Sequence, residues 1–235
     1  MSTIAENIAN IRAQMNEAAK KAGRDPSEIL LCAATKMNDA DRVKEAVAAG
    51  VDCCGENRVQ EIQAKRPLGA YEGKPLHFIG RLQTHKVKYL VGVVDLIESV
   101  DRMELLECIE KQAAKVGVVQ NILLEVNIGG EESKSGVSAE SLWPLLDMAA
   151  AQPHIRLRGL MAIPPAAATP DETRAFFAQM RELLAKAADR HYENAKMDIL
   201  SMGMSGDYPD AIREGATIVR IGTAIYGARD YSKKA

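Results

Sequence analysis

The sequence predicts an α/β fold, a single (β/α)8 TIM barrel with an extra N-terminal helix. Two observations support this fold class. Eight short apolar runs alternate with amphipathic helical patterns over about 200 of the 235 residues, which is typical of a parallel barrel. Several runs are continuously apolar, as in strands that are buried on both faces. A doubly wound open sheet is the alternative. Since no linker or low-complexity segment interrupts the pattern, we expect residues 1–235 to form one domain.

The first element is a helix that precedes the strand–helix repeats. Thr3 and Glu6 have the spacing of a capping box. Apolar residues then recur at helical spacing, at Ile4, Ile8, Ile11 and Met15. The helix is expected to end near Ala22, before Gly23.

The first four strand–helix units follow in order. The expected strands are 29–36, 52–55, 76–79 and 94–98. Each is followed by a start signal for a helix. These signals are Asn38-Asp39, Glu56-Asn57, Gln83-Thr84 before an apolar pattern at Val87 and Leu90, and Asp101.

The last four units repeat the pattern. Their strands are expected at 121–128, 157–162, 197–200 and 217–221. Ser138 is expected to cap the helix after the fifth strand, and Pro170 lies at the start of a long amphipathic helix. A short helix with Pro209 in its first turn separates the last two strands.

Composition excludes several classes of function. The net charge is −2 and aromatic residues make up 4% of the chain, which argues against a nucleic-acid-binding surface. No apolar segment is long enough to span a membrane, and the N-terminus lacks the apolar core of a signal peptide. The four cysteines do not have zinc-site spacing. We therefore expect a cytoplasmic protein with free thiols and without metal.

Lys36 ends the apolar run 29–36, at the carboxyl end of the first expected strand. Barrel enzymes place their functional groups at this end of the strands. The alternative is that the lysine only extends its charge into water.

The loops after strands 7 and 8 have the composition of a phosphate site. Ser201, Gly203, Ser205 and Gly206 follow strand 7, and Gly222-Thr223 follows strand 8. Glycine lets backbone N–H groups approach an oxyanion, and barrels often bind phosphate at these two loops. Ordinary turn residues are the alternative.

Arg220 interrupts the apolar strand 217–221. Because an unpaired buried charge is costly, Arg220 must have a partner. Alternation places it on the same face as Gly222, so an inward orientation would bring the guanidinium to the barrel mouth beside strand 1 and Lys36. A purely structural ion pair with Glu56 or Glu125 is the alternative. A lysine, a fixed cation and a phosphate cup match the requirements of pyridoxal 5′-phosphate (PLP).

The chain also resembles a known family over essentially its whole length. It is similar to the pyridoxal-phosphate homeostasis proteins, whose fold is similar to the N-terminal barrel of alanine racemase. The segments that carry the resemblance are 34–36, 55–61, 77–80 with Leu82-Gln83, Asn127 with 133–136, 158–164, 200–205 with Asp207, and 219–227.

The resemblance implies a role for each candidate residue. Lys36 would bind the PLP aldehyde as a Schiff base, and Arg220 would face the pyridine nitrogen. Residues around the phosphate would be Ser201, Ser205, Gly222 and Thr223, while Asn57, His77 and Met204 would lie near the ring or the phosphate. The roles of Lys134 and His85, where the family often has Asn, stay open.

Two functions from different classes compete. The first is a PLP-binding protein of intracellular PLP homeostasis, without substrate turnover, which passes the cofactor to PLP-requiring apo-enzymes. The second is a PLP-dependent amino-acid racemase. Racemisation needs a second base, which in the racemases is a tyrosine of a further domain without counterpart in these 235 residues; Tyr226 and Tyr231 are the substitutes. We expect the non-enzymatic function and a monomer. A barrel that binds a sugar phosphate without a covalent lysine is a third possibility.

Overall fold

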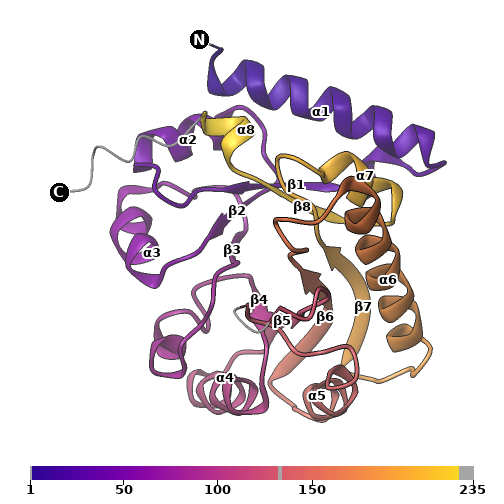
Figure 1. Cartoon of the computed structure of the whole chain (residues 1–235). Coiled ribbons are helices and arrows are strands. Elements are labelled where there is room, and N and C mark those ends of the chain that lie inside the picture. The colour runs from indigo at the N-terminus through magenta and orange to yellow at the C-terminus, as the bar shows by residue number, and fades with distance from the viewer. Residues whose placement is uncertain (1, 132–133, 228–235) are drawn as a thin grey trace.

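The computed structural model describes residues 2–131 and 134–227. Its eight parallel strands form a closed barrel in the order β1 to β8 (Figure 1). This arrangement confirms the predicted (β/α)8 fold and rejects the open sheet. The strands are β1 (Leu30–Ala34), β2 (Cys53–Glu56), β3 (Leu76–Phe78), β4 (Leu96–Val100), β5 (Gln120–Val126), β6 (Ile155–Ala162), β7 (Ala195–Ser201) and β8 (Ile218–Ile221).

Helices alternate with the strands and form the outer layer. The α-helices are α1 (Ile4–Lys21), α2 (Ala40–Ala48), α3 (Val59–Lys65), α4 (Met103–Val116), α5 (Leu142–Ala150), α6 (Pro170–Ala188), α7 (Tyr208–Arg213) and α8 (Thr223–Tyr226). Short 3₁₀ helices are η1 (Pro26–Glu28), η2 (Arg66–Leu68) and η3 (Thr84–Tyr89). The sequence pattern predicted a helix where η3 lies, without its type. Among the described residues, no helix is long and apolar enough to cross a membrane.

The N-terminal helix α1 begins at the predicted capping box, in which Thr3 accepts from the Glu6 amide and Glu6 accepts from the Thr3 amide. It packs against α7, α2 and α8, outside β1 and β8 (Figure 1). Asn7 donates to the carbonyl of Ile225 in α8, and Tyr208 of α7 donates to Gln14. Since α7 and α8 are short, α1 supplies much of the apolar cover on this side.

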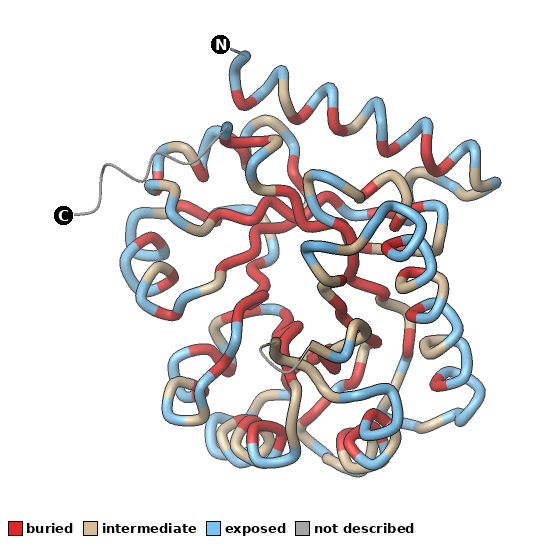
Figure 2. Tube along the Cα trace, in the orientation of Figure 1, coloured by how far each residue is buried: buried red, intermediate tan, exposed pale blue. Residues whose placement is uncertain are grey.

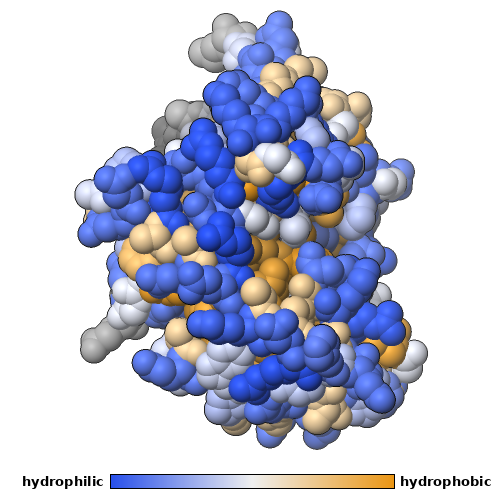
Figure 3. Space-filling view, turned by 90° about the vertical axis from the view of Figure 1, so that its right-hand side faces the viewer, coloured by the Kyte–Doolittle hydropathy of each residue, from blue (hydrophilic) through white to orange (hydrophobic). Residues whose placement is uncertain are grey.

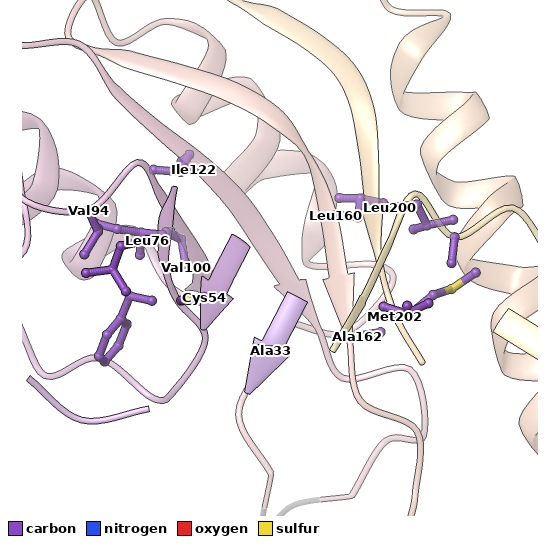
Figure 4. Close-up of a cluster of buried hydrophobic side chains, with 14 of the residues drawn as sticks. Ala33, Cys54, Leu76, Val94, Val100, Ile122, Leu160, Ala162, Leu200 and Met202 are labelled. Atoms are coloured by element: carbon purple, nitrogen blue, oxygen red, sulfur yellow. The ribbon is translucent and has the colours of Figure 1, made fainter. Parts of the chain in front are cut away.

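The buried residues form two layers, because successive strand side chains point to opposite faces. Outward-facing residues pack against the helices in one large core. Cys54, Leu76 and Ile122 in Figure 4 belong to this core. Figure 2 shows that the strands at the centre of the molecule are mostly buried. The face shown in Figure 3 is mostly hydrophilic, with apolar residues concentrated near its middle.

The inward-facing residues form a smaller cluster inside the barrel. It contains Cys32, Cys53, Leu96, Leu123, Met161 and Ile218. Polar inward residues, including Glu98, Ser201 and Arg220, occur later on their strands and so lie nearer the carboxyl end.

Candidate functional site

The pairing of β1 with β8 brings the two ends of the chain together at the barrel mouth. Cys32 lies opposite Arg220, and Ala33 lies opposite Ile221. A Cβ atom at Gly222 would lie 3.4 Å from the carbonyl oxygen of Ala34. Lys36 follows Ala34 by two residues and is half-buried. The predicted lysine and the predicted loop after strand 8 therefore share one rim.

Arg220 points into the barrel, as the alternation predicted. Its side chain is 4% exposed. One guanidinium nitrogen, Nη1, donates to Ser201 Oγ at 2.5 Å, and the other, Nη2, donates to the carbonyl of Ala162 at 2.9 Å. Its acidic partner is Glu98, whose Oε2 lies 3.8 Å from Nη1. Ser201 donates to the same Glu98 oxygen at 2.5 Å, so the hydroxyl links the two charges.

The two acidic partners that the sequence suggested for Arg220 were wrong. Glu56 pairs with Lys65 at 2.7 Å, and Glu125 accepts from Ser135 at 2.6 Å. Glu98 was not predicted as the partner of Arg220, although its place in the sequence indicated it. Glu98 interrupts the apolar run of its strand in the same way as Arg220, and two such opposite charges on the inner face of one barrel favour a pair.

His77 extends this chain of hydrogen bonds to β3. Its Nδ1 donates to Glu98 Oε1 at 2.7 Å, and the histidine is 6% exposed. Burial alone would lower the pKa of His77, but the bond to Glu98 and the charge of that carboxylate raise the pKa above 6.5. Burial would raise the pKa of Glu98, yet His77, Arg220 and Ser201 together lower the pKa below its usual value. The geometry thus favours a charged pair.

The loops after β7 and β8 also meet. The amide of Ala224 donates to Ser205 Oγ at 3.2 Å, and the Arg220 amide donates to the carbonyl of Gly203 at 2.9 Å. Gly203 has φ 91°, and a Cβ there would lie 2.6 Å from the Cβ of Ala211. The backbone of this turn therefore requires glycine. Met204 and Thr223 lie in the same two loops and are exposed.

Asn57 follows β2, two strands away from Arg220. It is half-buried, and its Oδ1 is buried without a hydrogen-bond partner within 2–131 and 134–227. A buried polar atom in this condition is uncommon in proteins. A Cβ atom at Gly80 would lie 2.3 Å from the Asn57 carbonyl, so the loop after β3 packs directly on this residue.

The two residues of open role lie in other loops. Lys134 pairs with Glu131 at 2.6 Å and donates to the carbonyl of Pro164 at 3.0 Å, which joins the loops after β5 and β6. His85 is exposed in η3 and lines a shallow groove with Arg81 and Arg102. Within residues 2–131 and 134–227, neither side chain forms a hydrogen bond or ion pair with Arg220 or Ser205.

Cys32, Cys53 and His77 form a compact cluster below the mouth. Their potential ligand atoms lie within 4.8 Å of one another. A hydrogen bond with Cys53, together with burial, raises the pKa of Cys32 well above its usual value, so the thiol stays protonated. Three donors are also one fewer than a structural zinc site uses. We therefore assign the two thiols to the packing of the barrel interior.

Comparisons with known proteins identify similar sequences and folds. The family model described as alanine racemase, N-terminal domain, matches residues 3–230. The pyridoxal phosphate homeostasis protein of Pseudomonas aeruginosa is 44% identical over 235 residues, covering 100% of both chains. That of Aquifex aeolicus is 43% identical over 226 residues, covering 96% of this chain and 98% of the relative. PipY of Synechococcus elongatus, solved with PLP bound, has a TM-score of 0.84 at 34% identity, covering 96% and 100%.

Proposed function

Because this chain belongs to the pyridoxal phosphate homeostasis protein family, we propose that it binds PLP as a Schiff base on Lys36. Its role is to hold the cofactor for intracellular PLP homeostasis. The observation that supports the proposal is the β1–β8 register, in which Arg220 lies opposite Cys32 and Gly222 lies against Ala34, two residues before Lys36. The bound cofactor supplies a reactive aldehyde and a pyridine ring that can accept electrons.

The residues present fit this cofactor. Lys36 provides a half-buried amine at the rim. Arg220 provides a cation that is fixed by Ser201 and by the Ala162 carbonyl. Since guanidinium does not release its proton, Arg220 would hold the ring nitrogen as an acceptor and leave the ring a weak electron sink. That property suits holding the aldehyde better than catalysis.

The remaining candidates divide by position. We assign phosphate binding to Ser205, Gly222 and Thr223, whose loops are joined by the bond between Ser205 and Ala224. Ser201 also belongs to this side, but its hydroxyl already bonds Glu98 and Arg220, so it supports the phosphate loop mainly by fixing Arg220. Asn57, His77 and Met204 flank the ring or the phosphate. The Oδ1 of Asn57, which has no hydrogen-bond partner among the described residues, would accept from a donor group of the ligand.

A racemase is the second candidate, and the state of Tyr226 disfavours it. A racemase needs a base on the face of the cofactor opposite the lysine. Burial raises the pKa of Tyr226 far above its usual value, which disfavours the ionised form that a base needs. Its backbone carbonyl accepts from Arg42, which also lies over its ring at 5.6 Å from the centroid. The other substitute, Tyr231, lies outside the described residues. We therefore propose that substrate turnover is absent or trace.

Absorbance and chemical reduction test the proposal. The purified protein with added PLP should be yellow, and borohydride followed by peptide mapping should place the cofactor on Lys36. Lys36→Ala should lose the absorbance band and the labelled peptide. A protein that takes up no PLP would exclude both the carrier and the racemase and would favour the sugar-phosphate barrel. Racemisation of L-alanine or another amino acid at about 1 s⁻¹ or faster would reject the carrier.

We also propose that the protein is a monomer that supplies PLP-requiring apo-enzymes. Sedimentation equilibrium tests the first part. For the second, the loaded protein is mixed with an apo-enzyme in the presence of a scavenger for free PLP. Recovery of enzyme activity despite the scavenger supports direct transfer, and no recovery rejects it.

A further inference from the structure

We propose that Lys65 is a positioning residue for Lys36, acting through the main chain on both sides of it. The inference rests on the proposed role of Lys36 and extends it to a residue without an assigned function. Lys65 lies in the last turn of α3 and is 7% exposed. It therefore lies behind the rim, in the interface between α3 and the barrel, and would not touch the cofactor.

The ammonium group of Lys65 has three hydrogens and three acceptors. It donates to Glu56 Oε1 at 2.7 Å, to Glu61 Oε2 at 2.8 Å and to the main-chain carbonyl of Thr35 at 2.9 Å. All of its hydrogen-bonding capacity is therefore used. These three acceptors fix the position of the side chain, whereas an ordinary surface lysine samples many rotamers.

Lys65, Glu56 and Glu61 form an ion cluster, the Lys65 cluster. It binds the main chain on both sides of Lys36. On one side, the Thr35 carbonyl accepts from Lys65, and the Thr35 hydroxyl donates to Glu56 at 2.6 Å. On the other side, the Met37 amide donates to the same Glu61 oxygen that Lys65 binds, at 2.8 Å. One ion cluster, buried at Glu56 and Lys65 and partly exposed at Glu61, therefore anchors residues 35 and 37 together.

The backbone at Met37 shows why such an anchor is needed. Met37 has φ 61°, a left-handed conformation that non-glycine residues rarely adopt. The Glu61 carboxylate holds its amide in that conformation. Without the anchor, the turn after Thr35 would relax, and the direction of the Lys36 side chain would change with it.

The cluster also places charge beside residues 35 and 37, which flank Lys36. Glu56, Glu61 and Lys65 sum to a net charge of −1 when ionised. Replacing Lys65 by a neutral residue would change this sum to −2 as long as both carboxylates stay ionised. The added negative charge would raise the pKa of the Lys36 amine, reduce its neutral fraction and slow its attack on the aldehyde. Geometry and charge act in the same direction.

Two measurements on Lys65→Met separate positioning from simple stabilisation. The first is the rate of covalent PLP attachment, followed by stopped-flow absorbance; we expect a decrease of about tenfold or more, since small misplacements of reacting groups have effects of this size. The second is made without cofactor: reductive ¹³C-methylation and NMR should report a raised pKa for the Lys36 amine. Glu61→Ala removes the Met37 anchor, and Glu61→Gln, which can still accept from the Met37 amide, should restore part of the rate.

A matched control uses an exposed pair of the same spacing. Lys21 and Glu17 form an i,i+4 ion pair on α1 with both side chains more than 60% exposed, so Lys21→Met should leave the attachment rate unchanged. If Lys65→Met does not fold, the Glu61 variants decide the question. Unchanged rate and unchanged Lys36 pKa in the folded variants would overturn the inference. Wild-type protein that binds no PLP would instead reject the proposed function.

Discussion

His77 donates a hydrogen bond to Glu98 across 2.7 Å inside the barrel, and both side chains are buried. The pair connects β3 to the Arg220–Ser201 pair of β8 and β7 through one carboxylate. A buried carboxylate with partners on three strands ties together parts of the barrel that are distant in sequence. This arrangement predicts how stability and cofactor binding respond to pH and to mutation.

The first prediction concerns stability at neutral to alkaline pH. The folded-state pKa of His77 lies above 6.5, so the folded protein retains a proton that the unfolded chain releases near pH 6.5. The free energy of unfolding should fall as the pH rises from 6.5 through the raised pKa. His77→Gln should flatten that slope in urea unfolding, whereas substitution of the exposed His191 by Gln should not. Equal slopes in wild type and His77→Gln would contradict the prediction.

The Glu98 side of the pair should act at acid pH. Its folded-state pKa is lowered, so its contribution is complete above its ordinary pKa and is lost as the pH falls through the lowered value. Glu98→Gln should therefore lose less stability than wild type on acidification below about pH 4.5. Thermal unfolding between pH 3 and 6 measures the difference; parallel curves would be evidence against it.

The third prediction concerns Arg220. Arg220→Ala should weaken PLP binding at least tenfold, because the ring nitrogen loses its cationic partner. It should also lower the free energy of unfolding by about 3–5 kcal/mol, since the buried Glu98 loses one of its two cationic partners and keeps only His77. PLP titration and urea unfolding measure the two effects. Arg174→Ala, which removes an exposed ion pair, is the control. Unchanged PLP affinity would show that Arg220 is only structural.

The fourth prediction compares two glycines of one loop. Gly203→Ala places a Cβ 2.6 Å from Ala211 at φ 91°, whereas Gly206 has no atom within 4 Å of the added Cβ. We expect Gly203→Ala to cost about 1–3 kcal/mol of stability and Gly206→Ala to stay within about 0.5 kcal/mol. Urea unfolding of both variants tests this, and similar costs would mean that the loop adjusts freely.

The fifth prediction concerns phosphate recognition. Ser205→Ala should weaken binding of PLP about tenfold and leave pyridoxal, which lacks the phosphate, unaffected. The ratio of the two dissociation constants is the measurement. Ser138→Ala, in an exposed turn before α5, is the control. An equal loss for both ligands would place Ser205 away from the phosphate.

Regular patterns carried the fold prediction, and they were sufficient for most elements. Eight apolar runs with helical stretches between them predicted the closed barrel. The type of helix after β3 was not predicted: apolar residues at helical spacing form the 3₁₀ helix η3 there. Periodicity over so few residues does not distinguish the two helix types, since their spacings differ little over two turns.

Side-chain pairing was harder to predict than side-chain direction. The alternation of side chains along the strand correctly predicted that Arg220 points inward. It did not predict which inward carboxylate Arg220 would contact. That choice depends on the stagger of the barrel, which places Glu98 near Arg220 and leaves Glu125 to Ser135. The Lys65 cluster was invisible for a related reason: a lysine in a helical pattern looks solvent-exposed until the helix is docked.

The position of α1 has a consequence for folding. This helix is made before the barrel strands, yet its partners α7 and α8 follow most of them in the sequence, and β1 acquires its β8 neighbour only when residues 218–221 exist. During synthesis β1 therefore presents one unpaired edge while most of the chain is being translated. Such long-range closure is slow and leaves the growing chain open to aggregation. We expect chaperone dependence to be greatest for ribosome-bound chains that stop before β8.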